Sequence, residues 1–143
     1  MYFSAPPYDR FRKDSGFISA EQEVVFLTIS RGNGCHYCMA AHSIIADQIS
    51  KVPPPVTDAI REGHPIPDSK LAALSGFTDT LLATRGLPSK AEVQAFLSAG
   101  YQERHVLEII LAIAVKTLSN YSNHLFHTPL DEMFAKREWK KSA

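Results

Sequence analysis

The sequence predicts an all-α protein, folded as a single domain of about six or seven helices. Apolar residues recur at helical spacing along most of the 143 residues. The segments that carry them begin at residues that cap helices and end at glycine or proline. Segments with the alternating pattern of strands are few, and no repeat, low-complexity tract or internal linker divides the chain. The hydrophobic fraction of 45% is enough for a core of its own at this length.

The first expected helix begins at residue 19. Ser19 followed by Gln22 fits a capping box, in which side chains bond the free backbone N–H groups at a helix start. The run from 24 to 29 (VVFLTI) suits a buried helix or a short buried strand equally well, because periodicity does not separate the two. Gly32-Asn33-Gly34 then predicts a turn that ends this element.

A second helix is expected from about 35 to 50, directly after that turn, and three consecutive prolines at 53–55 stop it. Its apolar stripe is formed by Cys38, Ala41, Ile45 and Ile49. A short helix over 56–62 can follow, ended by Gly63.

Two capped helices make up the next part of the chain. Asp68 is a suitable N-cap for a helix that ends near Gly86. Its apolar positions are Leu71, Leu74, Phe77, Leu81 and Leu82. Ser89 and Glu92 form another capping box, and the helix that they begin closes at Gly100.

The longest apolar element runs from 106 to 118 (VLEIILAIAVKTL) and can continue to His124. It is apolar around most of its circumference, which is typical of the central helix of a domain. In so small a domain this pattern also suggests burial between subunits. Thr128-Pro129 is expected to begin a last helix through Met133 and Phe134, because proline suits the first helical position.

Charge and hydropathy exclude several classes of partner. Fifteen basic and fifteen acidic residues cancel, so no net field favours nucleic acid or an anionic membrane surface. No apolar stretch approaches the roughly 20 residues that span a bilayer. We therefore expect neither nucleic acid nor a membrane as a partner.

The two parts of the chain differ in character. Residues 1–18 have no apolar run behind their charges, so they do not resemble a secretory signal, and we interpret them as an N-terminal arm on a neighbour's surface. Residues 19–143 are expected to form the helical domain. The expected compartment is the cytosol, where a close cysteine pair is more often catalytic or metal-binding than a structural disulfide.

The only two cysteines, Cys35 and Cys38, begin the second helix, and His42 follows one turn later on the same face. The free N–H groups and dipole of a helix N-terminus stabilise a thiolate, and a nearby imidazole can take its proton. Two cysteines at this spacing can also close to a disulfide, so one sulfur can attack a substrate and the other resolve the product. Glu23, on the preceding helix, can fold back and orient His42.

Other interpretations of these residues stay open. The helix dipole acts most on Cys35, whereas His42 is better placed for Cys38, so the residues alone do not choose the nucleophile. The two cysteines could be small buried hydrophobes. With His42 and either His124 or His127 they could instead bind zinc in a metal-binding or redox-sensing module.

Glu23, Cys35, Cys38 and His42 match the Glu-x11-Cys-x2-Cys-x3-His pattern of the AhpD-like alkylhydroperoxidases, in the carboxymuconolactone decarboxylase superfamily. The segment EVVFLTISRGNGCHYCMAAHS resembles the core helix pair of that family. The segment AGYQERHVLEIILAIAVKTLSNYSNHLFHTPLD is similar to the C-terminal part of its peroxidase-related branch. The resemblance covers residues of about 19 to 134.

This resemblance implies an AhpD-like helical fold assembled as a trimer or hexamer. It implies that Cys38 attacks the peroxide, that Cys35 resolves the sulfenic acid as a disulfide, and that Glu23 and His42 relay the proton from Cys38. A dithiol donor, such as a lipoyl-protein or a thioredoxin-like protein, would reduce the disulfide, and no resident cofactor is expected. A non-peroxidase member of the superfamily is the alternative, but such enzymes are expected to lack the cysteine pair.

One position departs from the family pattern. The best-studied members carry a histidine immediately before the second cysteine, where this chain has Tyr37. A phenol is no base at neutral pH, although it can donate a hydrogen bond. We therefore assign Tyr37 a supporting place at the cleft. Asn120, Asn123 and His124 are further candidates for the cleft lining, with a structural helix end as the alternative.

Overall fold

The computed structural model describes residues 6–142, and within them the chain forms seven α-helices, one 3₁₀ helix and no strand. Residues 1–5 and 143 lie outside this description. The elements are α1 (Pro6–Asp14), α2 (Ser19–Gly32), α3 (His36–Gln48), α4 (Pro54–Glu62), α5 (Ser69–Thr84), α6 (Lys90–Ser98), α7 (Glu103–Leu125) and η1 (Glu132–Arg137). The all-α prediction is confirmed, with slightly more helices than expected. The run 24–29 lies within α2, so the strand alternative is wrong.

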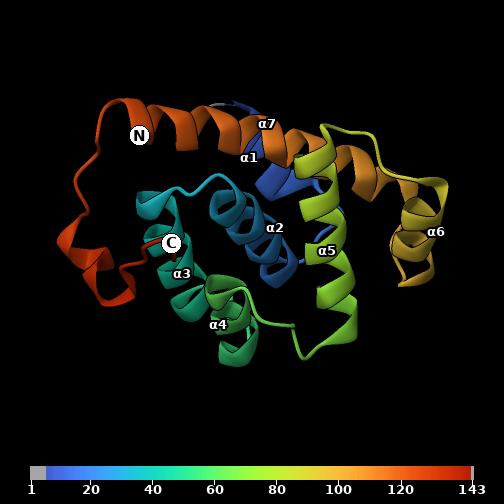
Figure 1. The fold of residues 1–143 in the computed structure, drawn as a ribbon, viewed down its shortest axis with the longest axis horizontal. Coiled ribbons are helices and arrows are strands. Elements are labelled where there is room, and N and C mark those ends of the chain that lie inside the picture. The colour runs from blue at the N-terminus through green and yellow to red at the C-terminus, as the bar shows by residue number, and fades with distance from the viewer. Residues whose placement is uncertain (1–5, 143) are drawn as a thin grey trace.

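Helix α2 lies at the centre of the molecule (Figure 1) and contacts α3, α4, α5 and α7. Every residue from 21 to 30 is buried, so α2 has no solvent-facing side along its middle turns. We expected 106–118 to be the central helix, and this prediction is wrong. That segment belongs to α7, which crosses one edge of the domain and leaves Leu107 and Leu118 exposed.

The start of α2 differs from the predicted capping box. Ile18 takes the N-cap position, and the Glu21 carboxylate accepts a hydrogen bond of 3.1 Å from its backbone N–H. The Gln22 side chain points toward α1 instead, where it donates to the backbone oxygens of Arg12 (3.1 Å) and Phe17 (3.2 Å). Gln22 therefore ties α1 to α2, because its amide satisfies carbonyls that would otherwise be buried without a partner.

Helix α1 replaces most of the expected N-terminal arm. The segment assigned to a neighbour's surface packs on the chain's own core: Phe11 and Phe17 are buried, and the rings of Phe11 and Phe26 lie 4.8 Å apart. The remaining part of the predicted arm, residues 1–5, lies outside the described residues. Burial of these aromatic side chains stabilises α1 against α2 and α7, so α1 is part of the domain.

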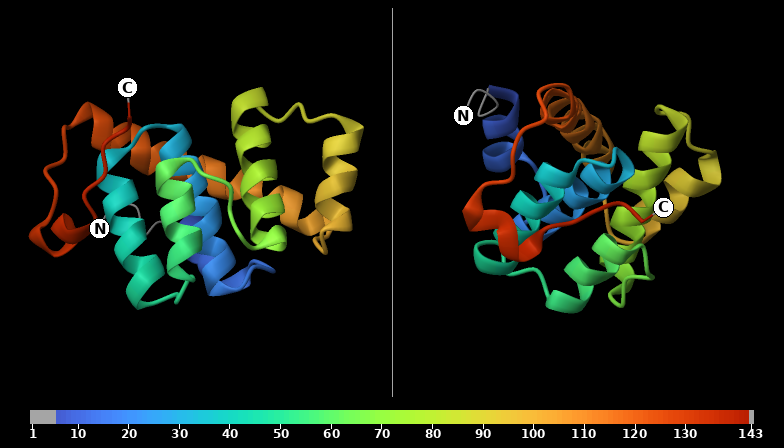
Figure 2. Two further views of the ribbon diagram at one scale, coloured as in Figure 1. Left: turned by 60° about the horizontal axis from the view of Figure 1, so that its bottom comes forward. Right: turned by 60° about the vertical axis from the view of Figure 1, so that its left-hand side comes forward.

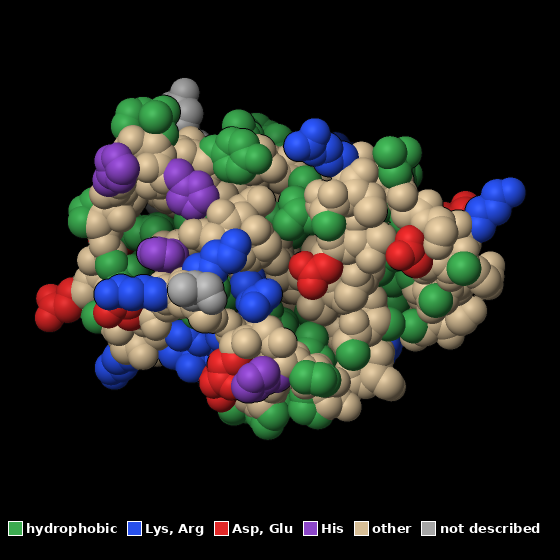
Figure 3. All heavy atoms as spheres, viewed as in Figure 1, with side chains coloured by type: hydrophobic (Ala, Val, Ile, Leu, Met, Phe, Trp, Pro, Cys, Tyr) green, Lys and Arg blue, Asp and Glu red, His purple; other side chains and the backbone are tan. Residues whose placement is uncertain are grey.

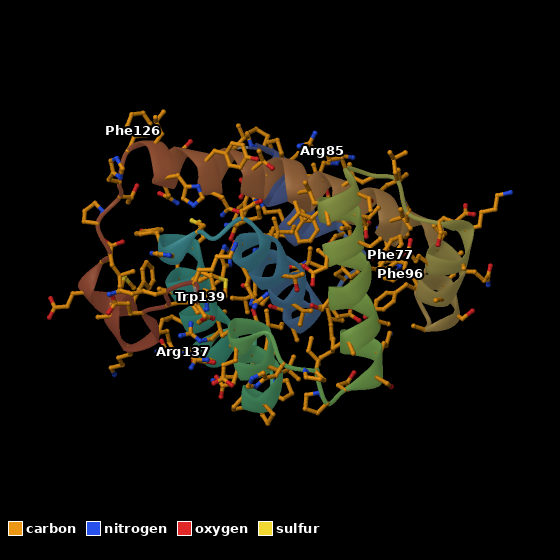
Figure 4. All side chains as sticks on the ribbon, in the orientation of Figure 1. Phe77, Arg85, Phe96, Phe126, Arg137 and Trp139 are labelled. Carbon is orange, nitrogen blue, oxygen red and sulfur yellow. The ribbon has the colours of Figure 1, made fainter. Side chains whose placement is uncertain are left out.

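Helices α5 and α6 form the side of the molecule away from α3 and are joined by stacked rings. Phe77 and Phe96 lie 4.4 Å apart (Figure 4). Phe96 also stacks on Tyr101 at 4.7 Å. Both predicted caps are confirmed: the Asp68 carboxylate accepts from the Leu71 N–H at 2.8 Å, and the Ser89 hydroxyl accepts from the Glu92 N–H at 3.1 Å.

The chain after α7 folds back on α3 (Figure 2). The last predicted helix, through Met133 and Phe134, is present as the 3₁₀ helix η1, but its predicted start at Thr128-Pro129 is wrong. The Thr128 N–H donates to the carbonyl of Asn123, so Thr128 completes the end of α7, and the next helical turns begin only at Glu132 as η1. Beyond η1, the Trp139 indole donates to the Arg61 carbonyl at 2.8 Å and fixes the segment against α4 (Figure 4).

Among residues 6–142, the helices are too short or too polar for any of them to cross a lipid bilayer.

The central place of α2 predicts a large difference between two leucine substitutions. Leu27→Ala removes a fully buried side chain of α2 and should lower the free energy of unfolding by about 2–5 kcal/mol, because a cavity remains. Leu87→Ala, at a position 80% exposed in the α5–α6 loop, should change it by less than about 0.5 kcal/mol. Urea unfolding followed by circular dichroism measures both, and equal effects would contradict the central position of α2.

Candidate active site

The two cysteines meet at the start of α3, as predicted. Cys35 is the N-cap residue, and its Sγ accepts a hydrogen bond of 3.4 Å from the backbone N–H of Cys38. The tight turn from α2 into α3 depends on Gly34, whose φ of 69° is a conformation that few side chains tolerate. The turn places both sulfurs at the positive end of α3, where a thiolate is stabilised.

Only one of the two sulfurs faces open space. Cys38 lines a cavity of about 250 Å³ between α1, α3, α7 and η1, whereas Cys35 is fully buried behind it. The walls of the cavity are mostly apolar and are formed by Tyr8, Tyr37, Ile45, Val115 and Phe134. A small molecule that enters this cavity therefore meets Cys38 before it can reach Cys35.

Glu23 and His42 form the predicted pair. Glu23 Oε2 lies 2.8 Å from His42 Nδ1, and both side chains are buried. Arg12 of α1 forms an ion pair with the other carboxylate oxygen, Oε1. Arg12 is a residue that the sequence analysis missed, because it lies in the segment interpreted as an arm.

Lys116 of α7 is the second site residue that the sequence analysis missed. Its Nζ lies 2.8 Å from His42 Nε2, and its side chain is only 3% exposed. A protonated amine can only donate, so Nε2 of His42 accepts from Lys116, and Nδ1 carries the proton given to Glu23. A sequence signal existed: Lys116 is the one cation in the apolar run 106–118.

The surroundings of the two thiols shift their pKa values in opposite directions. The pKa of Cys38 is lowered, chiefly by the hydrogen bond from the Cys35 thiol and also by the positive charge of Lys116. The Asn123 amide donates to Cys38 Sγ at 3.2 Å and acts in the same direction. The pKa of Cys35 is raised, because the same hydrogen bond and its burial both favour the protonated form. Cys38 is therefore the sulfur that ionises first.

The groups behind the thiols are also shifted. Burial lowers the pKa of His42, and the charge of Lys116 lowers it further, so His42 is neutral at pH 7. Burial lowers the pKa of Lys116 as well, although Cys38, Cys35 and Glu23 oppose this effect. Burial alone would raise the pKa of Glu23, but His42 and Arg12 outweigh it, so that pKa is lowered and Glu23 is a carboxylate.

Tyr37 closes one side of the cavity. Its hydroxyl donates a short hydrogen bond to the Asp131 carboxylate, and its ring meets Phe134 edge-on at 5.8 Å. Burial, with the Asp131 carboxylate, raises the pKa of Tyr37 to about 12, so this phenol keeps its proton at neutral pH. Tyr37 therefore connects α3 to the segment before η1 and does not act as a base.

Two predicted supporting residues do not line the cavity. Asn120 is buried but accepts from the Asn33 side chain at 2.9 Å and donates to Ser30, so it holds the α2–α3 turn. His124 is exposed on the surface of α7. Asn123, lying between them in sequence, is the residue of this group that reaches Cys38.

The structure does not assemble the zinc site considered above. In the part of the chain that the structure describes, no three His, Cys, Asp or Glu side chains are placed to hold one metal ion. His124 and His127, the candidate fourth ligands, are both exposed. Cys35 and Cys38 are present as free thiols.

The fold is that of the AhpD core, as two solved structures show. The first is an alkylhydroperoxidase AhpD core, an uncharacterized peroxidase-related protein from Ralstonia eutropha JMP134, with a TM-score of 0.80 and 24% sequence identity. The second is an uncharacterized peroxidase-related protein from Silicibacter sp. TM1040, with a TM-score of 0.78 and 18% identity. Each likeness covers 93% of this chain and 70% of the other. The chain matches no known protein-family model and no curated protein sequence.

The amide of Asn123 offers a test of the ionised thiol. Asn123→Leu removes a hydrogen bond to a charged sulfur, an interaction worth about 1.5–3 kcal/mol, so the pKa of Cys38 should rise by about one unit or more. Alkylation by iodoacetamide follows the thiolate, so the midpoint of its pH profile should rise by the same amount, and the rate at pH values below the parent's midpoint should fall about tenfold or more. Mass spectrometry of the alkylated peptide gives the rate at each cysteine.

Ser122→Ala is the matched control, because Ser122 neighbours Asn123 on α7 but lies outside the cavity lining. Its alkylation profile should coincide with that of the parent protein. Faster labelling of Cys35 than of Cys38 in the parent would contradict the assignment of the ionised sulfur.

Proposed function

We propose that the chain is a thiol peroxidase of the AhpD-like family, within the carboxymuconolactone decarboxylase superfamily. The observation that carries this proposal is the placement of the cysteine pair: Cys38 faces the cavity with a lowered pKa, and Cys35 lies directly behind it. The buried Glu23–His42 pair is linked to the cavity by the Lys116 amine, and these three groups make up the proposed proton relay of Cys38. The AhpD core fold, shared with two proteins named as peroxidase-related, supports the same function.

The proposed reaction has two steps on the protein. The Cys38 thiolate attacks a peroxide oxygen, so that an S–O bond forms, the O–O bond breaks, and the leaving oxygen takes a proton to become an alcohol or water. Cys35 then attacks the Cys38 sulfenic acid. An S–S bond forms and the S–O bond breaks, while the thiol proton and the hydroxyl leave as water. The peroxide is thereby reduced by two electrons, and the cysteine pair is oxidised.

An external dithiol completes the proposed cycle. A lipoyl-protein or a thioredoxin-like protein would exchange its two thiols for the Cys35–Cys38 disulfide and restore both cysteines. The pair itself carries the electrons, so the proposal involves no resident cofactor. We place this chemistry in the cytosol, where such reductants keep thiols reduced.

The proposal predicts distinct failures for the two cysteine variants. In Cys38→Ser the attacking sulfur is gone, so peroxide consumption with a dithiol donor should vanish. Cys35→Ser should still react once, because Cys38 is intact, and should stop at the sulfenic acid, which dimedone traps. Peroxide assays and intact-protein mass spectrometry measure both outcomes.

A thiol count before and after mild peroxide treatment is the control for the parent protein. Two thiols should disappear per chain and return with dithiothreitol. Full peroxidase activity in Cys38→Ser would overturn the assigned nucleophile. A reversible disulfide without turnover would favour a redox-sensing module, and stoichiometric zinc in protein purified without added metal would favour a metal-binding one.

We also propose that the chain forms a homo-oligomer through α7, in the trimeric or hexameric arrangement implied by the resemblance. An exposed apolar stripe runs along this helix, and its members are spaced three or four residues apart: Leu107, Ile110, Ala114, Leu118, Tyr121 and Leu125. Figure 3 shows hydrophobic side chains gathered at the edge of the molecule over α7. This spacing is that of a helix face covered by another helix, and a second copy of the chain supplies such a face.

Leu118→Glu places a charge in the middle of this α7 stripe. Burying that charge between copies is unfavourable, so the oligomer should dissociate to a folded monomer. Ile49→Glu, at the exposed C-terminal end of α3, should leave the assembly intact. Size-exclusion chromatography with light scattering distinguishes the two, and an unchanged mass for Leu118→Glu would argue against this interface.

A further inference from the structure

Helix α7 presents a polar face to Cys38 through residues that lie on one side of the helix. Lys116, Ser119 and Asn123 follow one another at helical spacing and all line the cavity that contains Cys38. Asn123 lies 3.2 Å and Ser119 4.0 Å from Cys38 Sγ. Lys116 stands one turn before Ser119 and is the only member of the three that can carry a charge.

The charge of Lys116 needs a partner, because an isolated buried ammonium is strongly disfavoured. Among residues 6–142, no carboxylate lies within ion-pair distance of Lys116. Glu23, the buried carboxylate of the site, is already bound by Arg12 and His42. The Cys38 thiolate is the remaining negative group that shares the cavity with Lys116.

His42 is poorly placed to take the proton of Cys38 directly. Its Nδ1 faces Glu23 at 2.8 Å, and its Nε2 faces the Lys116 amine at 2.8 Å. Both ring nitrogens are therefore engaged, and the accepting one is occupied by Lys116. The residue before Cys38, Tyr37, carries no positive charge, so a cation for the thiolate has to come from another element.

We propose that Lys116 supplies the positive charge that keeps Cys38 ionised, and that the Arg12–Glu23–His42 chain serves to hold the Lys116 amine beside it. The inference rests on the proposed function in one respect, which is that Cys38 is the attacking thiol. In this arrangement the buried charges form two pairs, Arg12 with Glu23 and Lys116 with Cys38, and neutral His42 links them. The proton that Cys38 loses resides on Lys116.

The titratable and charged groups that surround this pair come from three helices and one segment: Tyr8 and Arg12 of α1, Glu23 of α2, Cys35, Tyr37 and His42 at the start of α3, and Asp131 behind Tyr37. The positive charge of Lys116 lowers the pKa of Cys38, and the thiolate in turn raises the pKa of Lys116. The two groups therefore titrate as a pair. Removing the charge of Lys116 must change the pH at which Cys38 becomes reactive.

Three substitutions separate the charge of Lys116 from its hydrogen bond and from its volume. Lys116→Met keeps the length without charge, Lys116→Gln keeps a donor for His42 without charge, and Lys116→Arg keeps the charge. The readout is the pH profile of iodoacetamide alkylation at Cys38, which a merely structural role would not shift. Met and Gln should both move the midpoint of the profile to higher pH by about one unit or more, which slows alkylation about tenfold at pH values below the parent's midpoint. Arg should restore most of the reactivity.

Lys90→Met, on the exposed start of α6, is the matched control and should reproduce the parent profile. Far-ultraviolet circular dichroism shows whether each variant is helical. If Lys116→Met does not fold, Lys116→Gln is the variant that tests the proposal. A Lys116→Gln profile that superposes on that of the parent overturns the proposal. Because alkylation needs no peroxide, a shifted profile in a protein without peroxidase activity supports the role of Lys116 and counts only against the proposed function.

Discussion

The structure depends on one buried carboxylate. Glu23 lies in the middle of α2 with no exposed surface, and an unpaired charge there would be costly enough to unfold a domain of this size. Its two oxygens are satisfied from two directions, by Arg12 of α1 and by His42 of α3. His42 in turn engages Lys116 of α7. Four helices are therefore connected through one chain of polar contacts around α2.

The same requirement explains why α1 belongs to the domain. Helix α1 brings Arg12 to Glu23, and Arg12 also lies over the ring of Phe26 at 4.8 Å and donates to the Tyr8 hydroxyl. Tyr8 forms part of the cavity wall. The segment predicted to lie on a neighbour's surface thus contributes charge compensation, aromatic burial and the shape of the site. Loss of α1 would expose Glu23 and open the cavity together.

Local signals in the sequence predicted the elements that depend on neighbouring residues. The caps at Asp68 and Ser89, the glycine turn before Cys35 and the alignment of Glu23 with His42 all follow from contacts along one helix or between consecutive helices. The partners that were missed, Arg12 and Lys116, reach the site from helices separated from α3 in the chain. Their approach depends on how α1 and α7 pack, which spacing does not encode.

Composition also did not distinguish α2, the central helix, from α7, which lies at the edge of the domain. Helix α2 and the 106–118 run are similarly apolar. Helix α2 contains buried polar residues that other elements of the chain contact, whereas the exposed stripe of α7 contains no buried polar residue.

The rotation of α7 about its axis determines which asparagine reaches the Cys38 sulfur. Asn120 and Asn123 differ by 300° around a helix, so only 60° separates the two directions in which they point. Asn120 bonds the α2–α3 turn and Asn123 bonds the Cys38 sulfur, and a small rotation of α7 would exchange these roles. The predicted helix start at Thr128-Pro129 is wrong for a similar reason, because the Thr128 N–H bonds the Asn123 carbonyl at the end of α7.

The contacts that stabilise a Cys38 thiolate also affect the reduction potential of the cysteine pair. Contacts that favour a Cys38 thiolate exist only while the sulfurs are separate, since a disulfide carries no charge for Lys116 or Asn123 to stabilise. They therefore lower the free energy of the reduced form alone and make the disulfide a stronger oxidant, as for other cysteine pairs with a stabilised thiolate. Closing the bond would also leave the Lys116 ammonium without a negative group in the cavity that it lines. A disulfide formed between Cys35 and Cys38 would therefore be reduced more readily than one formed without these contacts.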